Sequence, residues 1–544
     1  MSDPRPHSPT EKDSLVTKPV VLIAEVLSPA TIAALGPDFE VRNVDGTDRD
    51  ALRDALQTAD AVLVRSATQV DAEALSWAPQ LKVIARAGVG LDNVDIKAAT
   101  QAGVMVVNAP TSNIISAAEL TVAHILGLAR HLQRAHSSLA EGQWKRSAFT
   151  GIELYEKTVG IVGIGRIGAL VAERLRGFGV ELIAYDPYVT AARAQQLGVQ
   201  LVTLEELVER VDFLTIHMPR TPETLGMIGA DQLKAMKKTA YVLNVARGGL
   251  IDEAALAAAL ADGEIAGAAL DVFMQEPPAD TSLVGLPNVN VTPHLGASTE
   301  EAQEKAGVAV AKSVRLALSG DLVPDAVNVA GAGIDEYVRP GLPLTEKLGQ
   351  VFAGLANGPL ASIDIEVHGE LAEHKVEALR LAALKGVFSK IVSDPVSYVN
   401  APLLAEQRNV EVRFSADSLA ESFRNVITIR GSLTDGTQLS VSGTLTGPKQ
   451  IEKLVGVNGY DVELPLTENL LVFSYTDRPG IVATYGALLG EAGVNIANLQ
   501  IERDEKRGTA LSVVAIDSPV AEDLVEKLGA AIGAESIHAI QIDA

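Results

Sequence analysis

The sequence predicts an α/β protein with two doubly wound parallel-sheet domains, followed by an α+β domain and a C-terminal domain of βαββαβ order. Three observations predict this architecture. A chain of 544 residues is too long for one hydrophobic core. Strand-like and helix-like segments alternate over the first 330 residues, as they do in βαβ units. Beyond a small-residue joint at 331–333, the order changes to helices and strands with a hairpin expected around Asp435-Gly436, and then to strand, helix, two strands, helix and strand.

The first domain is predicted from short apolar runs separated by helical segments. A polar, proline-containing stretch at residues 1–18 precedes it, and we expect this tail to be disordered. Ser28-Pro29 is typical of a helix cap and first turn. The predicted strands are 20–26, 39–43, 61–65, 81–85 and 104–108, and the predicted helices are 28–35 and 48–58. A helix at 300–319 is expected to pack back on this domain, which makes it discontinuous, at residues 19–116 and 300–330.

The second domain, residues 117–299, begins with a predicted helix at 117–134 and centres on GIGRIG, residues 163–168. This motif follows a β-branched strand and opens a helix, which is the context of a dinucleotide-binding turn. Gly163 would allow the tight turn, Gly165 would let the backbone approach a pyrophosphate, and Gly168 would let helix and strand pack closely. The helix N-terminus offers free N–H groups to phosphates. We therefore predict a Rossmann-like domain, with further strands at 180–185, 212–217, 240–245, 265–272 and 289–292.

Asp186 indicates which dinucleotide is bound. It ends the strand after the glycine motif, where a carboxylate accepts the two ribose hydroxyls of an adenosine. A carboxylate there would also repel a 2′-phosphate. Its neighbours Pro187 and Tyr188 offer no guanidinium to hold one. The sequence thus favours NAD over NADP.

The composition narrows the function classes. The formal net charge is −24 and there is no long basic run, which disfavours nucleic acid and anionic membrane as partners. No segment has the apolar length of a membrane span. The chain contains no cysteine, which excludes disulfides and thiolate nucleophiles and fits a reducing cytoplasm. No His, Asp and Glu grouping has metal-ligand spacing, so we expect no metal.

Three residues at strand ends of the second domain are candidates for catalysis: Arg247, Glu276 and His294. The ends of parallel strands meet at one edge of a sheet, which would bring these residues near the nicotinamide end of a bound NAD. His294 suits the base that takes a hydroxyl proton, and Glu276 would hold its other ring nitrogen. Arg247 offers a planar fork for a substrate carboxylate. Singly, each residue has an ordinary structural explanation, whereas together behind a dinucleotide site they favour catalysis.

The first domain supplies candidates for substrate binding. Arg65-Ser66 and the Gly88-Val89-Gly90 turn follow strands and would face the same cleft. Lys145 and Arg146 could add positive charge there, although a solvated loop explains them equally well. His124, His131 and His136 lie in or just after a helix and are expected to be structural.

The motifs RAGVGLDNVD, VGIVGIGRIG, NVARGGLIDE, ALDVFMQEPP and TPHLGAST resemble the D-isomer-specific 2-hydroxyacid dehydrogenases over residues 20–329. The resemblance implies Arg247 as the substrate-binding arginine, Glu276 as the partner of the histidine and His294 as the acid/base. Val89 departs from the pattern, because relatives can carry a hydroxyl residue there. The implied NAD contacts are Val89, Arg166, Ile167, Asp186, Met218, Val245, Ala246, Arg247, Asp271, His294, Leu295, Gly296 and Ala297.

The likeness extends beyond the first 330 residues. Residues 331–466 resemble the intervening domain of the longer members, which oxidise 3-phosphoglycerate at the start of serine biosynthesis. Residues 467–544 resemble an ACT domain, and YTDRPGI and AGVNI match its ligand loops. This implies Tyr475, Asp477 and Asn495 as contacts of the effector serine, and a homotetramer, since these modules pair with their own copies in relatives. The alternatives are a hydroxypyruvate or glyoxylate reductase, a non-catalytic NADH sensor, and an amino-acid sensor built on the ACT domain.

Overall fold

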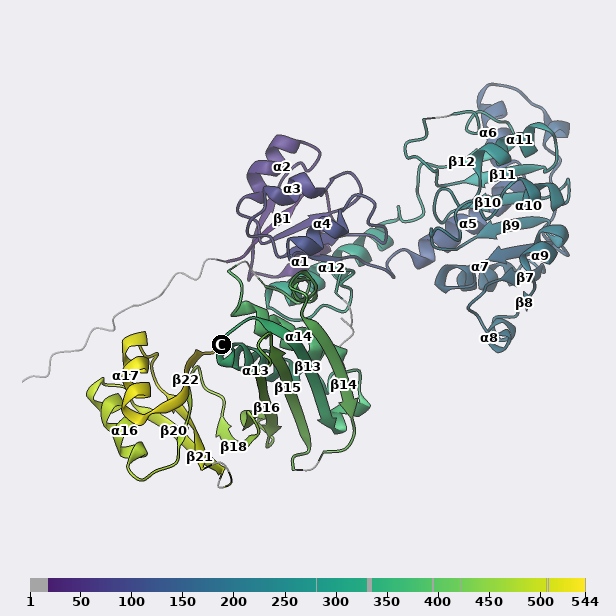
Figure 1. The fold of residues 1–544 in the computed structure, drawn as a ribbon. Coiled ribbons are helices and arrows are strands. Elements are labelled where there is room, and N and C mark those ends of the chain that lie inside the picture. Colours follow the sequence, from purple (N-terminus) through teal and green to yellow (C-terminus); the bar gives the residue numbers. More distant parts are fainter. Residues whose placement is uncertain are drawn as a thin grey trace, which may run out of the picture.

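The described part of the chain folds into four β-sheets with their covering helices. The computed structural model describes residues 18–279, 281–329, 335–393, 396–420, 422–504, 506 and 508–543. The predicted tail therefore lies outside the described residues except for Lys18, and so does the expected small-residue joint at 331–333. Figure 1 shows two α/β bodies, the first sheet with α1–α4 and the second sheet with α5–α11; the last two sheets with α13–α17 lie beside the first body, with which they share a hydrophobic cluster.

The first sheet is parallel, in the order β2-β1-β3-β4-β5. Its central strands are buried on both faces, as expected of continuous apolar runs. Helix α1 begins after Ser28, whose hydroxyl accepts the N–H of Ala30, so the predicted cap is confirmed. The elements are β1 (Val20–Ile23), α1 (Pro29–Leu35), β2 (Glu40–Asn43), α2 (Arg49–Leu56), β3 (Ala61–Val64), α3 (Ala72–Ser76), β4 (Val83–Arg86), α4 (Ile96–Gln101) and β5 (Met105–Val107).

Helix α12 (Glu300–Leu318) returns to this sheet from much later in the chain. It packs against α1 and against strands β3, β4 and β5 (Figure 1). The first sheet is thus covered by a helix that follows the whole second sheet in sequence. The two chain crossings this requires lie just before α5 and just before α12. Ser116, in the first turn of α5, and Thr299, which caps α12, are joined by a hydrogen bond of 2.8 Å between their hydroxyl oxygens.

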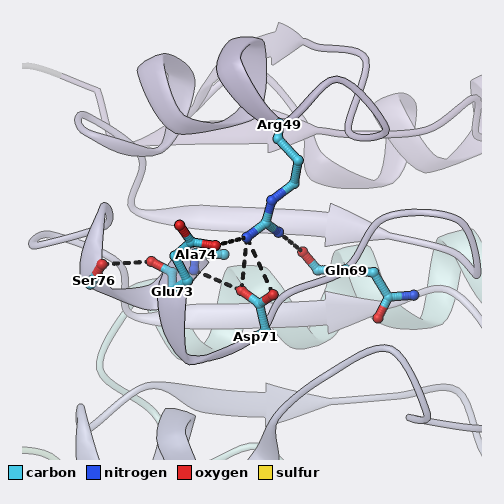
Figure 2. Close-up of polar contacts among 6 residues, drawn as sticks. All are labelled: Arg49, Gln69, Asp71, Glu73, Ala74 and Ser76. Carbon is cyan, nitrogen blue, oxygen red and sulfur yellow. Dashed lines mark hydrogen bonds and ion pairs between the residues drawn. The ribbon is translucent and has the colours of Figure 1, made fainter.

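Hydrogen bonds and ion pairs from Arg49 hold the loop between β3 and α3. Arg49, on α2, donates to the carbonyl oxygen of Gln69 at 3.2 Å and pairs with the carboxylates of Asp71 and Glu73 (Figure 2). Asp71 also caps α3 by accepting the N–H of Ala74. The far end of this loop is therefore tied to a neighbouring helix.

The second sheet is parallel, in the order β12-β11-β10-β9-β6-β7-β8. The chain enters at β6, winds outward to β8, and then returns to build β9 to β12 on the other side. Such a reversal leaves a crevice at the carboxyl ends of β6 and β9, where ligands of doubly wound sheets bind. The strands are β6 (Thr158–Val162), β7 (Glu181–Tyr185), β8 (Gln200–Leu201), β9 (Phe213–Ile216), β10 (Tyr241–Asn244), β11 (Gly267–Leu270) and β12 (Val289–Val291).

The single helix predicted at 117–134 is wrong, because the structure has two helices there. Helix α5 ends at Ala129, His131 adopts φ of 50°, and a new helix begins at Leu132. The carbonyl oxygen of Ala129 accepts the N–H of Ile152, so a later segment of the chain terminates the first helix. The helices of this body are α5 (Ile114–Ala129), α6 (Leu132–Ala140), α7 (Arg166–Arg176), α8 (Ala191–Gln196), α9 (Leu204–Arg210), α10 (Ala230–Ala235) and α11 (Glu253–Ala261), with a 3₁₀ turn, η1 (Arg146–Phe149).

The third sheet is mixed, in the order β14-β13-β15-β16-β17-β18, and only β13 and β14 are parallel. The hairpin predicted around Asp435-Gly436 joins β15 to β16. A second hairpin, absent from the sequence-based expectations, turns at Asn458-Gly459. The elements are α13 (Gly341–Leu355), β13 (Leu360–Gly369), η2 (Glu370–Glu373), α14 (Glu377–Ser389), α15 (Ala401–Gln407), β14 (Glu411–Asp417), β15 (Asn425–Leu433), β16 (Gln438–Thr446), β17 (Ile451–Val457) and β18 (Tyr460–Pro465).

The fourth sheet is antiparallel, in the order β20-β21-β19-β22, and two helices cover it. The chain order is strand, helix, two strands, helix and strand, as predicted. Its elements are β19 (Asn469–Thr476), α16 (Ile481–Glu491), β20 (Ile496–Asp504), β21 (Thr509–Ile516), α17 (Glu522–Ile532) and β22 (Ala534–Gln541).

Candidate active site

The turn between β6 and α7 has the geometry of a phosphate-binding loop. Gly163 has φ of 91°, and a Cβ on it would lie 2.7 Å from the carbonyl oxygen of His217, so only glycine fits. A Cβ on Gly168 would collide with the carbonyl oxygen of Gly163. Gly165, by contrast, faces open space, and a Cβ added to it would meet no atom within 4 Å. Helix α7 has no side-chain cap at its N-terminus, so its free N–H groups face the space in front of Gly165.

Asp186, the predicted ribose ligand, lies next to this turn. One carboxylate oxygen accepts the N–H of Ile164 at 2.9 Å, and the other accepts the N–H of Tyr188 at 2.9 Å. Each oxygen has a second lone pair, so the carboxylate can still accept from two hydroxyl groups. These backbone contacts fix the carboxylate beside the glycine loop, where the ribose of a dinucleotide would lie.

A cavity of about 800 Å³ lies at the carboxyl ends of β9, β10 and β11 and reaches Ile167 in the first turn of α7. Its volume suits a large cofactor. Open space at Gly165, an uncapped helix N-terminus and a placed carboxylate together fit a dinucleotide. The predicted contacts that line the cavity are Val89, Ile167, Met218, Val245, Ala246, Arg247, Asp271, His294, Gly296 and Ala297. Those outside its lining are Gly163, Gly165, Arg166, Gly168, Asp186 and Leu295.

His294 and Glu276 form a direct pair. The Nδ1 atom of His294 lies 2.6 Å from Oε2 of Glu276, whose other oxygen accepts the N–H of Phe273 at 3.0 Å. A carboxylate only accepts hydrogen bonds, so Nδ1 carries the proton and Nε2 of the neutral ring is free to accept one. The backbone of His294 is held in the left-handed region, with φ of 54°. This is the geometry of an oriented general base.

A buried carboxylate anchors the loop that carries His294. Asp271, which is fully buried, accepts the hydroxyl of Thr292 at 2.6 Å and the N–H groups of Leu295 and Gly296 at 2.7 and 2.9 Å. Nε2 of His124 lies 3.1 Å from the Thr292 hydroxyl oxygen. Burial lowers the pKa of His124, which keeps this imidazole neutral. His124 thus contacts Thr292 of the loop that carries His294, and Asp271 anchors that loop as well as lining the cavity.

Arg247 follows β10 in a tightly bonded turn. The side chain of Asn244 donates to the carbonyl oxygen of Arg247 at 2.8 Å and accepts the N–H of Ala246 at 3.0 Å. The guanidinium group donates from Nη1 to the carbonyl oxygen of Ala246 at 2.7 Å. Arg247 lines both the large cavity and a smaller one beside it. It therefore stands where a cofactor and a substrate would meet.

The smaller cavity, of about 320 Å³, brings together the predicted substrate-binding residues of the two α/β bodies. It is lined by Arg65, Ser66, Gly88, Val89 and Gly90 from the first body, and by Arg247, Glu276 and His294 from the second. Its size suits a small metabolite. Its polar groups are those required to bind an anionic 2-hydroxy acid and take its proton.

Arg86 also lines this cavity, although it was not among the residues predicted from the sequence. It is the last residue of β4, next to the strand that Arg65 follows. Burial lowers the pKa of Arg86, and the nearby charge of Arg247 lowers it further. The sequence feature that could have identified Arg86 as a site residue is its position at the end of a strand, just before the Gly88-Val89-Gly90 turn. The cavity thus collects three guanidinium groups, which favours a substrate carrying more than one negative charge.

Lys145 and Arg146 are not among the residues that line either cavity. Lys145 lines a separate hollow beside α6, and Arg146 opens the exposed turn η1. Among the described residues, no group of three or more His, Cys, Asp or Glu side chains could hold a metal ion. In the same part of the chain, every helix is too short or too polar to cross a membrane.

The predicted effector residues occupy different environments. Tyr475 is buried in the core of the fourth sheet, and its hydroxyl oxygen lies 3.0 Å from that of Ser512. Asp477, at the end of β19, pairs with Arg503 at 3.3 Å. Asn495 is exposed just before β20, and its N–H donates to Asp517. Asp477 and Asn495 therefore lie closer to solvent than Tyr475.

Comparison with known protein families identifies three parts of the chain. Residues 122–296 match the family model for the D-isomer specific 2-hydroxyacid dehydrogenase, NAD binding domain. Residues 337–458 match the D-3-phosphoglycerate dehydrogenase intervening domain, and residues 469–533 match the ACT domain. The D-lactate dehydrogenase from Aquifex aeolicus, solved with NAD and lactic acid, is 29% identical with a TM-score of 0.50, covering 56% of this chain and 96% of that one. The fold and site thus define an NAD-dependent D-2-hydroxyacid dehydrogenase.

Relatives that match nearly the whole length identify the family within this class. The D-3-phosphoglycerate dehydrogenase of Mycobacterium tuberculosis (strain H37Rv) is 50% identical over 525 residues, which cover 96% of this chain and 99% of the relative. That of Methanocaldococcus jannaschii is 40% identical over 511 residues, covering 93% and 97%. The chain belongs to the D-3-phosphoglycerate dehydrogenase family.

Proposed function

We propose that the protein oxidises D-3-phosphoglycerate to 3-phosphooxypyruvate with NAD, the first step of phosphorylated serine biosynthesis. The observation that carries this proposal is the smaller cavity, in which three arginines surround the His294–Glu276 pair. A 2-hydroxy acid with a second anionic group matches that distribution of charge. A substrate with one carboxylate would leave at least one of the three guanidinium groups without an anionic partner.

The residues of the cavity divide the reaction between them. Arg247 binds the substrate carboxylate through its planar fork. Nε2 of His294 takes the proton of the C2 hydroxyl, and Glu276 stabilises the imidazolium that forms. NAD, when bound in the larger cavity, supplies the hydride acceptor. Arg65 and Arg86, on adjacent strand exits of the first sheet, hold the phosphate.

The test is NADH oxidation with 3-phosphooxypyruvate and, in parallel, with unphosphorylated hydroxypyruvate. Losing contacts to a charged group costs about 1.5–3 kcal/mol, so we expect kcat/KM to be at least about tenfold higher for the phosphorylated substrate. Equal or reversed preference would support a hydroxypyruvate or glyoxylate reductase. An absence of turnover with both would support a cofactor or amino-acid sensor.

A homotetramer is the proposed assembly, in line with the modules that pair in relatives. Helix α6 and the segment after it leave large apolar side chains in solvent, with Leu132 57%, Leu139 56% and Trp144 77% exposed. Apolar side chains gathered in this way are typical of an interface. Light scattering should give about four times the chain mass of 57.0 kDa. A monomer mass would contradict the proposal.

The ACT domain is proposed to bind serine, at Asp477 and Asn495 with Tyr475 behind them. A carboxylate and an amide can hold the ammonium group and the hydroxyl of a small amino acid. Serine bound there would make the activity of the catalytic site depend on the concentration of the pathway's end product.

We also propose a cytoplasmic location, because a phosphorylated substrate does not cross a membrane unaided and the chain has no cysteine.

A further inference from the structure

The loop after β3, which carries Arg65 into the substrate cavity, is organised around one carboxylate. Oε1 of Glu25 accepts the N–H groups of Arg65 at 2.8 Å and Thr68 at 3.0 Å. The N–H of Ala67 is shared between its two oxygens, at 3.2 and 3.3 Å. Glu25 follows β1, which pairs with β3 in the sheet. Its side chain therefore contacts the loop that follows the neighbouring strand. Three backbone donors of one loop therefore converge on a single side chain.

The carbonyl side of the same loop is held as well. The side-chain amide of Asn93 donates to the carbonyl oxygens of Arg65 and Thr68, at 3.0 and 2.6 Å. Nε of Arg86 donates to the carbonyl oxygen of Arg65 at 3.1 Å. Farther along, Arg49 binds the carbonyl oxygen of Gln69 (Figure 2). Arg65 therefore emerges from a loop whose backbone is held from both sides.

We propose that Glu25 is the positioning residue for Arg65: it holds the backbone of the 65–68 loop from behind, so that the guanidinium group faces the phosphate of the substrate. Glu25 is not among the residues that line the cavity, and it therefore acts through Arg65. This inference rests on the proposed function, because it takes Arg65 as a phosphate ligand.

Glu25 also decides how the phosphate is recognised. Converging backbone N–H groups commonly form an anion site. Here they are already bound by a carboxylate of the protein, so the substrate phosphate has to be held by side chains. Glu25 contributes charge as well. Burial and Arg247 lower the pKa of Arg86, and the carboxylates of Asp92 and Glu25 oppose that effect. The Glu25 carboxylate thus offsets part of the repulsion between Arg86 and Arg247, which both line the cavity.

The variant Glu25→Gln keeps the size of the side chain and one acceptor oxygen but removes the charge. Its amide NH₂ would face the N–H of Ala67, where two donors repel. We expect KM for 3-phosphooxypyruvate to rise about tenfold, with a smaller change in kcat, and no change in kcat/KM for hydroxypyruvate. Glu25→Asp, which restores the charge on a shorter side chain, should recover part of the loss.

Asp60→Asn is the matched control. Asp60 lies at the other end of β3, accepts the N–H of Val20 at 2.9 Å and binds Lys82 at 3.0 Å. It makes the same kind of carboxylate contact in the same sheet, away from the cavity. We expect Asp60→Asn to leave the preference for the phosphorylated substrate unchanged. An equal loss of preference in both variants would mean that Glu25 only stabilises the fold, which would overturn the proposal.

A double-mutant cycle tests whether Glu25 acts through Arg65. In an Arg65→Ala background, Glu25→Gln should cause only the small further loss that comes from its effect on Arg86, whereas fully additive losses would overturn the proposal. Hydrogen exchange of the 65–68 amides provides a test that does not depend on the substrate. Exchange should be faster in Glu25→Gln and unchanged in Asp60→Asn, and unchanged exchange in Glu25→Gln would count against the positioning role. A wild-type enzyme without phosphate preference would refute the proposed substrate, while the exchange result would still decide the role of Glu25.

Discussion

Asp271 anchors the loop of His294, the proposed acid/base, and Asp271→Asn tests how strongly turnover depends on that anchoring. The carboxylate receives three donors, the hydroxyl of Thr292 and the N–H groups of Leu295 and Gly296. An asparagine offers a single acceptor oxygen. If that oxygen takes the place of Oδ1, it keeps Thr292 and Leu295, and the new NH₂ group then points at the N–H of Gly296. No orientation of the amide satisfies all three donors through acceptor atoms.

The cost follows from these contacts. A buried N–H left without a partner costs about 1–3 kcal/mol, and each remaining bond loses about 1 kcal/mol with the charge. A penalty of this size favours a shift of the loop that follows Asp271. A shift of about 1 Å at a catalytic group lowers turnover about 10²-fold. We therefore expect kcat/KM for the Asp271→Asn enzyme to fall about 10²-fold, with the melting temperature lowered as well.

The assay is steady-state NADH oxidation, combined with NADH binding followed by fluorescence. Thr292→Val is the control, because it removes one donor and leaves both N–H contacts, and it should cost no more than about tenfold. Wild-type kcat in Asp271→Asn would refute the anchoring role. A loss confined to NADH affinity would mean that Asp271 acts only as a cofactor contact.

Three further predictions concern the other ionisable groups. Glu276→Gln should lower kcat about 10- to 100-fold with NADH affinity retained, since a charge-assisted bond contributes about 1.5–3 kcal/mol; wild-type kcat would contradict the pairing. Burial lowers the pKa of His217 to about 4, so the unfolded chain binds a proton between pH 6.5 and 4 that the folded chain does not, and stability falls as pH falls through this window. Denaturant unfolding should show that the free energy of unfolding falls by at most about 2 kcal/mol between pH 7 and pH 5. If the His217→Gln variant lost as much stability over the same range, His217 would not be the source of the loss. Asp477→Ala should relieve inhibition by serine with little effect on uninhibited turnover, and an enzyme still fully inhibited would argue against this site.

The parts of the candidate site that lie together as the sequence predicted are governed by local geometry and strand order. Gly163 and Gly168 are required by a turn whose strand and helix are adjacent in sequence, so six residues define it. His294 and Glu276 follow neighbouring strands of one parallel sheet, and topology alone brings such positions to a common edge. The glycine motif and the acid/base pair could therefore be predicted without coordinates.

Of the two elements that were missed, one depends on a contact between distant segments and the other does not. Helix α5 ends at Ala129 because Ile152 supplies its carbonyl with a partner, and the sequence around residue 130 contains no helix-breaking residue. The hairpin of β17 and β18 did have a local signal. Asn458 and Gly459 both have positive φ, the conformation for which Asn-Gly is selected in two-residue turns. That hairpin was predictable, and the end of α5 was not.

Three carboxylates explain why the arginines and the histidine could be located from sequence while their orientation could not. Glu25 holds the loop of Arg65, Asp271 holds the loop of His294, and Glu276 holds the imidazole ring itself. In the first two cases the acceptor binds backbone N–H groups, which every sequence has, so no partner residue type marks the contact. The 69 acidic side chains of the chain all look alike in this respect. What distinguishes Glu25 and Asp271 is their place at the exit of a strand next to the one whose loop they bind, and that neighbour relation follows only from the strand order of the folded sheet.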